Sequence, residues 1–327
     1  MDILGLTFNE VHDLVRPHRH QQKSLRAEYR RLLHGEGVEN STLHADILPV
    51  VHQAIDGDLT KLIQRTADGL EIESVVVPMQ HRGRACKTLC VSSQIGCARG
   101  CLFCQTARIG RPRNLTAGEI VGQVAAAIRE TGGPIRNVVF MGMGEPFDNF
   151  DAVIQAIRVI TDRSGLSLGM ERVAISTVGQ PEGIRRLAAL GWRRINLAVS
   201  INAPNDEIRS QIMPINRLVP MAKLREALMA YPLRKCQFFM IEYVLIPGVN
   251  DAREHVSELV EYLRPLKCVV NVIPYNPRRE SPWPAPSEEL VVAFLGWLKE
   301  EGQVCKRRIT KGREQLAACG QLGNLPR

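Results

Sequence analysis

Residues 88–105 read Thr-Leu-Cys-Val-Ser-Ser-Gln-Ile-Gly-Cys-Ala-Arg-Gly-Cys-Leu-Phe-Cys-Gln. Its last three cysteines, Cys97, Cys101 and Cys104, follow an apolar run and have the spacing Cys-x-x-x-Cys-x-x-Cys. Thiolates are soft ligands that suit iron–sulfur clusters. Three of them can hold one face of an iron–sulfur cube and leave one iron open for chemistry. A structural zinc site is the alternative, but it takes four ligands, usually as two close pairs, and no second pair lies nearby.

Short apolar runs alternate with helical patterns from this stretch onward. The six runs are Thr88–Ser93, Asn137–Met141, Arg172–Thr177, Ile195–Ile201, Phe238–Ile246 and Val269–Ile273. Six strands that alternate with helices predict an α/β fold built of parallel βα units with right-handed crossovers. A closed barrel needs eight units, so the sequence predicts a partial (βα)6 barrel. Function in such folds lies at the carboxyl ends of the strands.

The first 70 residues differ from the remainder. Leu25–Leu33 and Ile47–Leu62 have the apolar spacing of short helices, which predicts a small N-terminal helical accessory domain over 1–70. Residues 71–327 then form the barrel core, with the C-terminal tail at its end. The accessory domain carries basic residues at Arg16, His18, Arg19, His20, Lys23, Arg26, Arg30 and Arg31. A solvated helix face is the alternative to a binding surface.

Composition narrows the class of protein. The 327 residues include 42 Lys and Arg against 34 acidic residues, a formal net charge of +8 that favours a polyanionic partner. Aromatic residues are only 5 %, which disfavours a stacking platform for single strands. Nine cysteines are an odd number, and the sequence shows no signal peptide and no apolar run of roughly 18 residues. We therefore expect a reduced, cytoplasmic protein that does not enter a membrane, and a monomer, since nothing demands a dimer.

The cysteine stretch and eight further segments, in order from about residue 70 to residue 323, resemble the RlmN/Cfr family of radical S-adenosylmethionine (SAM) enzymes, which methylate RNA adenosines. The segments are Asn114-Leu-Thr-Ala-Gly-Glu-Ile120, Gly142-Met-Gly-Glu-Pro146, Ser176-Thr-Val-Gly179, Ala203-Pro-Asn-Asp-Glu207, Met213-Pro-Ile-Asn216, Gly248-Val-Asn-Asp251, Ile273-Pro-Tyr-Asn-Pro277 and Ala317-Ala-Cys-Gly-Gln-Leu322. Each segment alone is a weak signal, and their common order makes the resemblance specific.

The resemblance implies a cofactor site. Cys97, Cys101 and Cys104 would hold a 4Fe–4S cluster, and SAM would chelate its fourth iron. Gly144 and Glu145 would meet the methionyl amino group, because glycine lets a ligand approach the backbone and a carboxylate pairs with an ammonium. The remaining SAM contacts implied by the match are Ser176, Ser200, Ile201, Asn202 and Asn276. An ordinary turn at Gly144, and capping roles for Ser and Asn in βα loops, are the alternatives.

Three further residues match family positions with a chemical role. Cys319 matches the cysteine that takes a methyl group from one SAM, after which a second SAM supplies the radical that removes hydrogen from this S-methyl group. The resulting methylene radical adds to an electron-poor adenine carbon. Cys90 matches the thiol that forms a transient disulfide with Cys319 and so releases the methylated base. Glu73 matches the segment of a proposed proton acceptor; a buried tail cysteine and a strand-edge carboxylate are the alternatives for Cys319 and Glu73.

The implied function is methylation of adenine C2 in 23S rRNA, and in relatives also in tRNA, with an electron donor such as flavodoxin or ferredoxin. Cfr-like methylation of C8, or the same chemistry on another RNA, are the alternative activities. A non-catalytic iron–sulfur protein that binds RNA is disfavoured, because binding alone needs neither Cys90 nor Cys319. The chain reads Ser200-Ile-Asn202 where the family usually has Ser-Leu-His.

Overall fold

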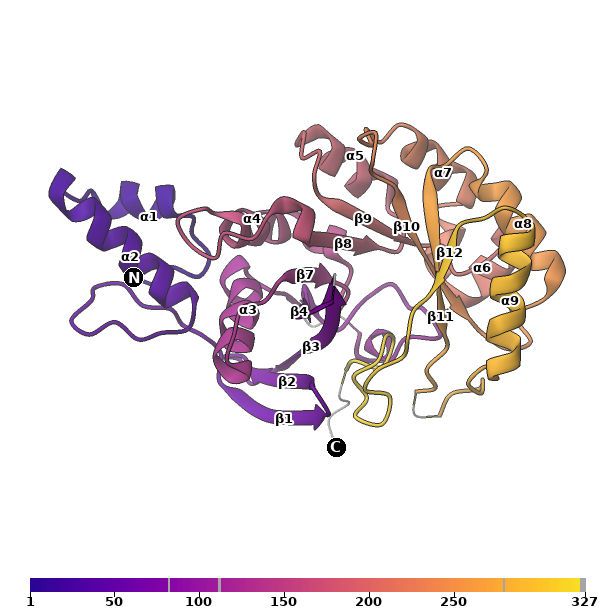
Figure 1. Ribbon diagram of the computed structural model, residues 1–327, viewed down its shortest axis with the longest axis horizontal. Helices are drawn as coiled ribbons and strands as arrows, with labels where there is room; N and C mark the ends of the chain where they lie inside the picture. The colour runs from indigo at the N-terminus through magenta and orange to yellow at the C-terminus, as the bar shows by residue number, and fades with distance from the viewer. Residues whose placement is uncertain (82, 111–112, 279, 324–327) are drawn as a thin grey trace. The chain divides into compact units, whose positions relative to one another are not determined.

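The computed structural model describes residues 1–81, 83–110, 113–278 and 280–323 (Figure 1). The chain divides into two compact units. The first unit comprises Met1–Ile95 and Pro112–Val173, and the second comprises Gly96–Arg111 and Ala174–Arg327. The predicted domain boundary at residue 70 lies inside the first unit and stays a proposal.

The first unit opens with helices. They are α1 (Phe8–Val15), the 3-10 turn η1 (Arg19–Gln21) and α2 (Gln22–Leu33). A capping box starts α1, because the Thr7 hydroxyl accepts the Glu10 N–H while the Glu10 carboxylate accepts the Thr7 N–H. Helix α2 is amphipathic and buries Leu25, Tyr29 and Leu33. The predicted helix at Leu25–Leu33 is confirmed.

The predicted helix at Ile47–Leu62 is wrong. This stretch forms an antiparallel hairpin of β1 (Val50–Asp56) and β2 (Leu59–Arg65). Gly57 takes a φ of +57° at the first position of the two-residue turn, a backbone conformation that favours glycine. The hairpin continues antiparallel into β3 (Glu71–His81) and β4 (Arg84–Cys90). The N-terminal part is therefore helical at its start and a β-meander at its end.

Strand β4 begins the parallel part of the first unit. It pairs in parallel with β7 (Asn137–Phe140), and the crossover between them contains α3 (Ala117–Thr131). The segment Thr116–Glu119 is a capping box that starts α3, and Gly132 in the left-handed region ends it. The other elements of this unit are β5 (Gln94–Ile95), β6 (Arg113–Asn114), η3 (Pro146–Asn149), α4 (Phe150–Thr161) and η4 (Met170–Arg172).

The second unit is a run of parallel strands in sequence order. Its strands are β8 (Val173–Thr177), β9 (Asn196–Ser200), β10 (Phe239–Leu245), β11 (Cys268–Pro274) and β12 (Cys305–Arg307). Its helices are η2 (Thr106–Ile109), α5 (Pro181–Ala189), α6 (Asp206–Ile212), η5 (Pro214–Arg217), α7 (Met221–Met229), α8 (Arg253–Leu263) and α9 (Glu288–Glu300). Helices α8 and α9 lie side by side, as do α5 and α7 (Figure 1).

The predicted α/β alternation is confirmed, since each of the six predicted runs overlaps a strand: β4, β7, β8, β9, β10 and β11. Burial explains why β8 to β11 read as apolar runs, because each of these strands buries most of its residues. Within the described residues, no helix is long and apolar enough to cross a membrane.

Candidate active site

The three motif cysteines lie on one loop of the second unit, which we call the cysteine loop (residues 96–110). Its base is closed by the Cys97 N–H, which donates to the Gly110 carbonyl at 2.5 Å. Gly96 has a φ of +72°, and a Cβ there would lie 1.9 Å from the Gly110 oxygen. Only glycine can therefore occupy position 96 in this closed loop.

Backbone contacts fix the middle of the cysteine loop. The Leu102 N–H donates to the Ile212 carbonyl at the end of α6 at 3.0 Å, and the Leu102 carbonyl accepts from Arg278 Nε at 3.1 Å. Cys101 is 8 % exposed and belongs to an apolar cluster that includes Met213 and Tyr275. The loop is thus packed against segments that follow β9 and β11.

The donor set of this loop fits an iron–sulfur cluster. All three side chains are thiols, and three sulfur ligands leave one iron of a 4Fe–4S cluster without a protein ligand. Burial raises the pKa of the Cys104 thiol, while hydrogen bonds from Thr106 and Ala107 and the positive charge of Arg278 act in the opposite direction. Among the described residues, no three His, Cys, Asp or Glu side chains lie close enough together to bind one and the same metal ion. A cubane does not require this, because each of its cysteine ligands binds a different iron.

Cys319 lies on the C-terminal tail, which is docked against the cysteine loop. The Gln105 N–H donates to the Gly320 carbonyl at 2.7 Å, and the Thr106 hydroxyl donates to the Leu322 carbonyl at 2.5 Å. The Cys319 residue is exposed although its neighbours Ala317 and Ala318 are buried. The tail therefore presents an exposed thiol beside the loop that carries the three motif cysteines.

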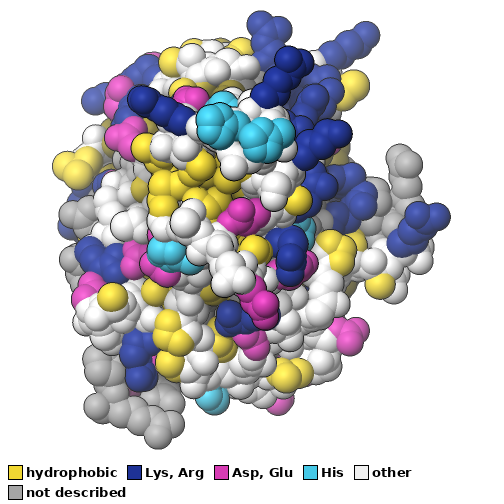
Figure 2. Space-filling model, turned by 90° about the vertical axis from the view of Figure 1, so that its left-hand side faces the viewer, with side chains coloured by type: hydrophobic (Ala, Val, Ile, Leu, Met, Phe, Trp, Pro, Cys, Tyr) yellow, Lys and Arg dark blue, Asp and Glu magenta, His cyan; other side chains and the backbone are white. Residues whose placement is uncertain are grey.

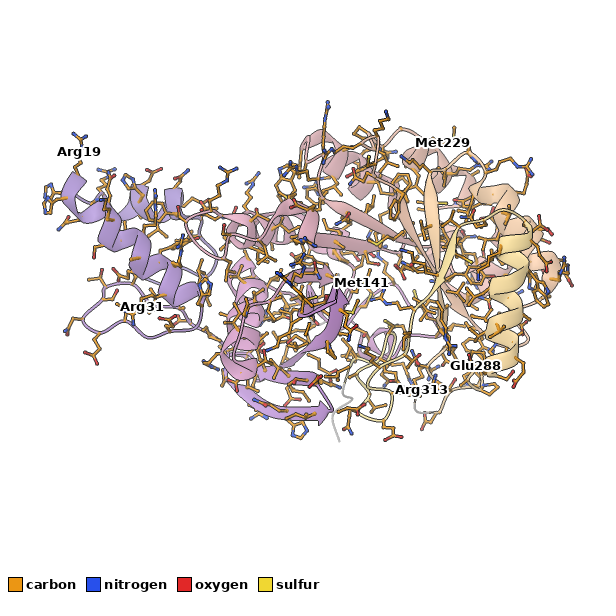
Figure 3. All side chains as sticks on the ribbon, in the orientation of Figure 1. Arg19, Arg31, Met141, Met229, Glu288 and Arg313 are labelled. Carbon is orange, nitrogen blue, oxygen red and sulfur yellow. The ribbon has the colours of Figure 1, made fainter. Side chains whose placement is uncertain are left out.

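Asn276 ties the same tail to the end of β11. Its Nδ2 donates to the Cys319 carbonyl at 3.2 Å, and its Oδ1 accepts from Nε of Arg313, which is labelled in Figure 3. Asn276 is only 2 % exposed. The side chain that the resemblance assigns to SAM contact thus also positions the residue assigned to methyl transfer.

Asn202, which replaces the family's usual histidine, is buried in a hydrogen-bond network. Its Oδ1 accepts the Val244 N–H at 2.9 Å, and its carbonyl accepts from Asn250 Nδ2 at 2.7 Å. Its φ is +57°, in the left-handed region that asparagine enters more readily than most side chains. The preceding Ile201 is fully buried, and Ser176 and Ser200 are half-buried on β8 and β9.

An arginine that the sequence analysis missed lies among these strand ends. Arg209 of α6 is fully buried, and its guanidinium donates to the Val178, Ser200 and Ile201 carbonyls and to Asn216 Oδ1 at 2.6–3.2 Å. Burial lowers the pKa of Arg209, but a guanidinium remains charged.

The other predicted site residues belong to the first unit. Gly144 follows β7 with a φ of +99°, and a Cβ there would lie 2.6 Å from the Gln94 Cβ. The Glu145 N–H donates to Gln94 Oε1 at 2.8 Å, and one Glu145 carboxylate oxygen accepts the Phe147 N–H at 3.1 Å. The buried Glu145 carboxylate therefore caps the turn η3.

Cys90 and Glu73 also lie in the first unit, on neighbouring strands. Cys90 is the half-buried last residue of β4 and pairs with Val75 in β3. Glu73 is buried, and its Oε2 lies 2.8 Å from the Lys61 Nζ of β2. A buried ion pair makes Glu73 a structural element of this sheet, whatever further role its carboxylate has.

We expect Glu73→Gln to lower the free energy of unfolding by about 3–5 kcal/mol, because the change leaves the buried Lys61 ammonium without this carboxylate. The matched control is the double variant Lys61→Met with Glu73→Leu, which should recover most of the loss. Denaturant unfolding measures both. A loss below about 1 kcal/mol, typical of a surface pair, would show that the pair does not stabilise the sheet.

Comparisons with known proteins agree with this geometry. The model of the Radical SAM superfamily matches residues 91–263. The probable dual-specificity RNA methyltransferase RlmN 1 of Protochlamydia amoebophila is 45 % identical over 278 residues, which are 85 % of this chain and 76 % of that protein. The chain belongs to the RlmN family of radical SAM enzymes. The RlmN of Campylobacter jejuni (strain ATCC 700819 / NCTC 11168) is 40 % identical over 282 residues, which cover 83 % of this chain and 79 % of the relative.

A solved structure extends the RlmN family assignment to the fold. The crystal structure of a radical SAM methyltransferase from Sphaerobacter thermophilus is 36 % identical, has a TM-score of 0.89 and covers 98 % of both chains. The predicted radical SAM fold is therefore confirmed, as is the prediction of a methyltransferase enzyme. Membership of the family implies a 4Fe–4S cluster and SAM, which the all-thiol donor set of the cysteine loop fits.

Proposed function

We propose that this RlmN-family enzyme methylates an adenosine in RNA, at C2 of adenine in 23S rRNA and also in tRNA. The docked C-terminal tail carries this proposal, because it holds the exposed Cys319 residue beside the cysteine loop. Relatives with 40–45 % identity that are named RNA methyltransferases support the substrate class. Cfr-like methylation of C8 is the second candidate, since the motifs shared by both branches do not select the carbon.

The cofactors would be held as follows. Cys97, Cys101 and Cys104 would bind the 4Fe–4S cluster. The iron without a protein ligand would chelate SAM, and the cluster would supply the electron for the reductive cleavage of SAM. An external electron donor such as flavodoxin or ferredoxin would reduce the cluster. The SAM-binding residues would be Gly144, Glu145, Ser176, Ser200, Ile201, Asn202 and Asn276. Of these, Asn202 and Asn276 use side-chain atoms to hold neighbouring backbone, so we assign them to shaping the site as well.

Two thiols would carry the group transfer. The Cys319 thiolate would attack the methyl carbon of one SAM, become a thioether and release S-adenosylhomocysteine. After the methylene carbon has bonded to adenine and the adenine carbon has lost its proton and the unpaired electron, the Cys90 thiolate would attack the Cys319 sulfur. A disulfide would form as the bond from sulfur to the methylene breaks, and the methylene carbon would keep that electron pair and take up a proton to become the methyl group. Glu73 would accept a proton in this sequence, although its Lys61 contact also gives it a structural role.

Mass spectrometry of nucleosides tests the function. The chain is expressed in a host that lacks its own enzyme, and nucleosides from 23S rRNA and tRNA are analysed. We expect C2-methyladenosine in rRNA and tRNA. Appearance of C8-methyladenosine would select the Cfr-like alternative, and an unchanged nucleoside profile would contradict the proposed activity in both RNAs.

The solvent face of α2 supports an RNA-engaging role for the N-terminal region. Lys23, Arg26 and Arg30 of α2, with Arg19 of the preceding turn η1, follow each other at spacings of three and four residues and are all exposed. Like charges at this spacing destabilise a helix, and positive charge near its N-terminus adds to the cost. Figure 2 shows Lys and Arg side chains gathered along part of the surface, and Figure 3 shows Arg19 extending outward from this segment. A polyanion would compensate this repulsion.

We expect the triple variant Arg19→Ala, Lys23→Ala and Arg30→Ala to bind RNA more weakly. The slope of the logarithm of the binding constant against the logarithm of the salt concentration should become shallower by about 0.7–0.9 for each lost phosphate contact. Arg26 is left in place because its guanidinium lies over the Phe8 ring, 5.1 Å from its centroid. Filter binding over a salt series measures the slope. The control removes the same charge at Arg185, Arg253 and Arg264, which form surface ion pairs with acidic residues. Equal slopes for both variants would show that the basic face of α2 is only solvated and makes no contacts with RNA phosphates.

A further inference from the structure

Arg209 has an unusual environment for an arginine. It is 0 % exposed, and within the described part of the chain every acceptor that its guanidinium contacts is neutral. Burying a charge costs free energy unless hydrogen bonds compensate it, so these bonds must be well formed. Asn216, which accepts from this guanidinium, also donates through Nδ2 to the Asp206 carboxylate at 2.8 Å. The hydrogen bonds that offset this cost join α6 to other segments of the chain.

The guanidinium fastens α6 to two strand ends. Nη2 donates to the Val178 carbonyl at 2.6 Å, just beyond β8, and to the Ser200 carbonyl at 3.2 Å, while Nε donates to the Ile201 carbonyl at 3.1 Å. The rigid fork of five donors lets one arginine contact both strand ends at once. Ser176 and Ser200, the half-buried SAM candidates, lie at these same strand ends.

The other end of α6 holds the cysteine loop. The Ile212 carbonyl, at the C-terminus of this short helix, accepts the Leu102 N–H at 3.0 Å. Cys101 packs in one apolar cluster with Ile212 and Met213. A continuous chain of contacts therefore runs from the carboxyl ends of β8 and β9, through Arg209 and α6, to the loop that carries the proposed cluster ligands.

We propose that Arg209 is a positioning residue that sets the cysteine loop, and with it the bound cluster, at the correct place relative to the SAM-binding ends of β8 and β9. This inference rests on the proposed function and names a residue that acts through the loop rather than on the substrate.

The test uses the reconstituted enzyme and the change that SAM produces in the electron paramagnetic resonance spectrum of the reduced cluster. In Arg209→Met, we expect the SAM concentration for half of this change to rise about tenfold, because misplacing bound groups by even an ångström has effects of this size or greater. Arg209→Lys keeps the charge but lacks the planar fork, so we expect an intermediate shift. The lysine variant decides the question if the methionine variant does not fold.

The control is Leu259→Ala, which truncates a fully buried residue on α8, outside α6 and outside the cysteine loop, and lowers stability. It should keep the wild-type SAM concentration for the spectral change. A wild-type response in the folded Arg209 variants, or the same shift in Leu259→Ala, would overturn the positioning role alone. A wild-type chain that forms no iron–sulfur cluster would instead overturn the proposed function, and the positioning role with it.

Discussion

Cys101→Ala should reduce the iron bound after anaerobic reconstitution from about four per chain to near background. It should also abolish the cleavage of SAM to 5′-deoxyadenosine. Cys101 is the middle ligand of the predicted set and is buried among apolar residues, and its loss leaves two thiols to hold the cluster. Alanine occupies less volume than cysteine and adds no polar group, so the apolar packing around the loop is retained. Iron analysis and quantification of 5′-deoxyadenosine measure the two effects.

Cys236→Ala is the matched control for Cys101→Ala. Cys236 is exposed, lies outside the cysteine loop and has no proposed role, so its loss should leave iron content and SAM cleavage unchanged. Cys101→Ala with full iron and normal SAM cleavage would remove Cys101 from the ligand set. Cluster assembly in the wild type without any 5′-deoxyadenosine would contradict the radical enzyme itself.

The parallel strands β8 to β11 could be predicted from the sequence because most of their residues are buried, which makes them nearly continuous apolar runs. The edge strand β1 is different, since most of its residues are exposed and no alternation of buried and accessible residues marks it. Ile47, Val50, Val51 and Ala54 fall at helical spacings by coincidence. The Asp56–Gly57 step was the signal for a hairpin, because glycine supplies the positive φ that the turn requires.

The candidate site was predictable only where chemistry dictates residue types. The spacing of the motif cysteines points to a cluster whatever the fold around it. In contrast, Arg209 lies in a polar segment, Asp206-Glu207-Ile-Arg209-Ser-Gln211, which reads as a solvated helix. Its burial accompanies hydrogen bonds to backbone carbonyls just past β8 and β9, and backbone acceptors leave no trace in residue identity. The same holds for Asn202, whose substitution for histidine fits a buried amide at positive φ.

Cys90→Ala should trap a covalent complex between protein and RNA and reduce free methylated RNA to background. If Cys90 resolves the bond between Cys319 and the methylated base, a chain without this thiol can form that bond but cannot break it. Cys90 ends β4, and nothing but a sulfur nucleophile at this position would yield the disulfide. Denaturing gel electrophoresis detects the complex, and mass spectrometry after nuclease and protease digestion locates the nucleotide on the Cys319 peptide.

Cys86→Ala is the matched control for Cys90→Ala, because Cys86 is also half-buried and lies four residues earlier on the same strand, where its side chain points to the same face. It should release methylated RNA at the wild-type yield. The double variant Cys90→Ala with Cys319→Ala should form no covalent complex, since the attachment atom is gone. Normal release from Cys90→Ala would exclude Cys90 from product release, and a complex that persists in the double variant would place the covalent bond on a residue other than Cys319.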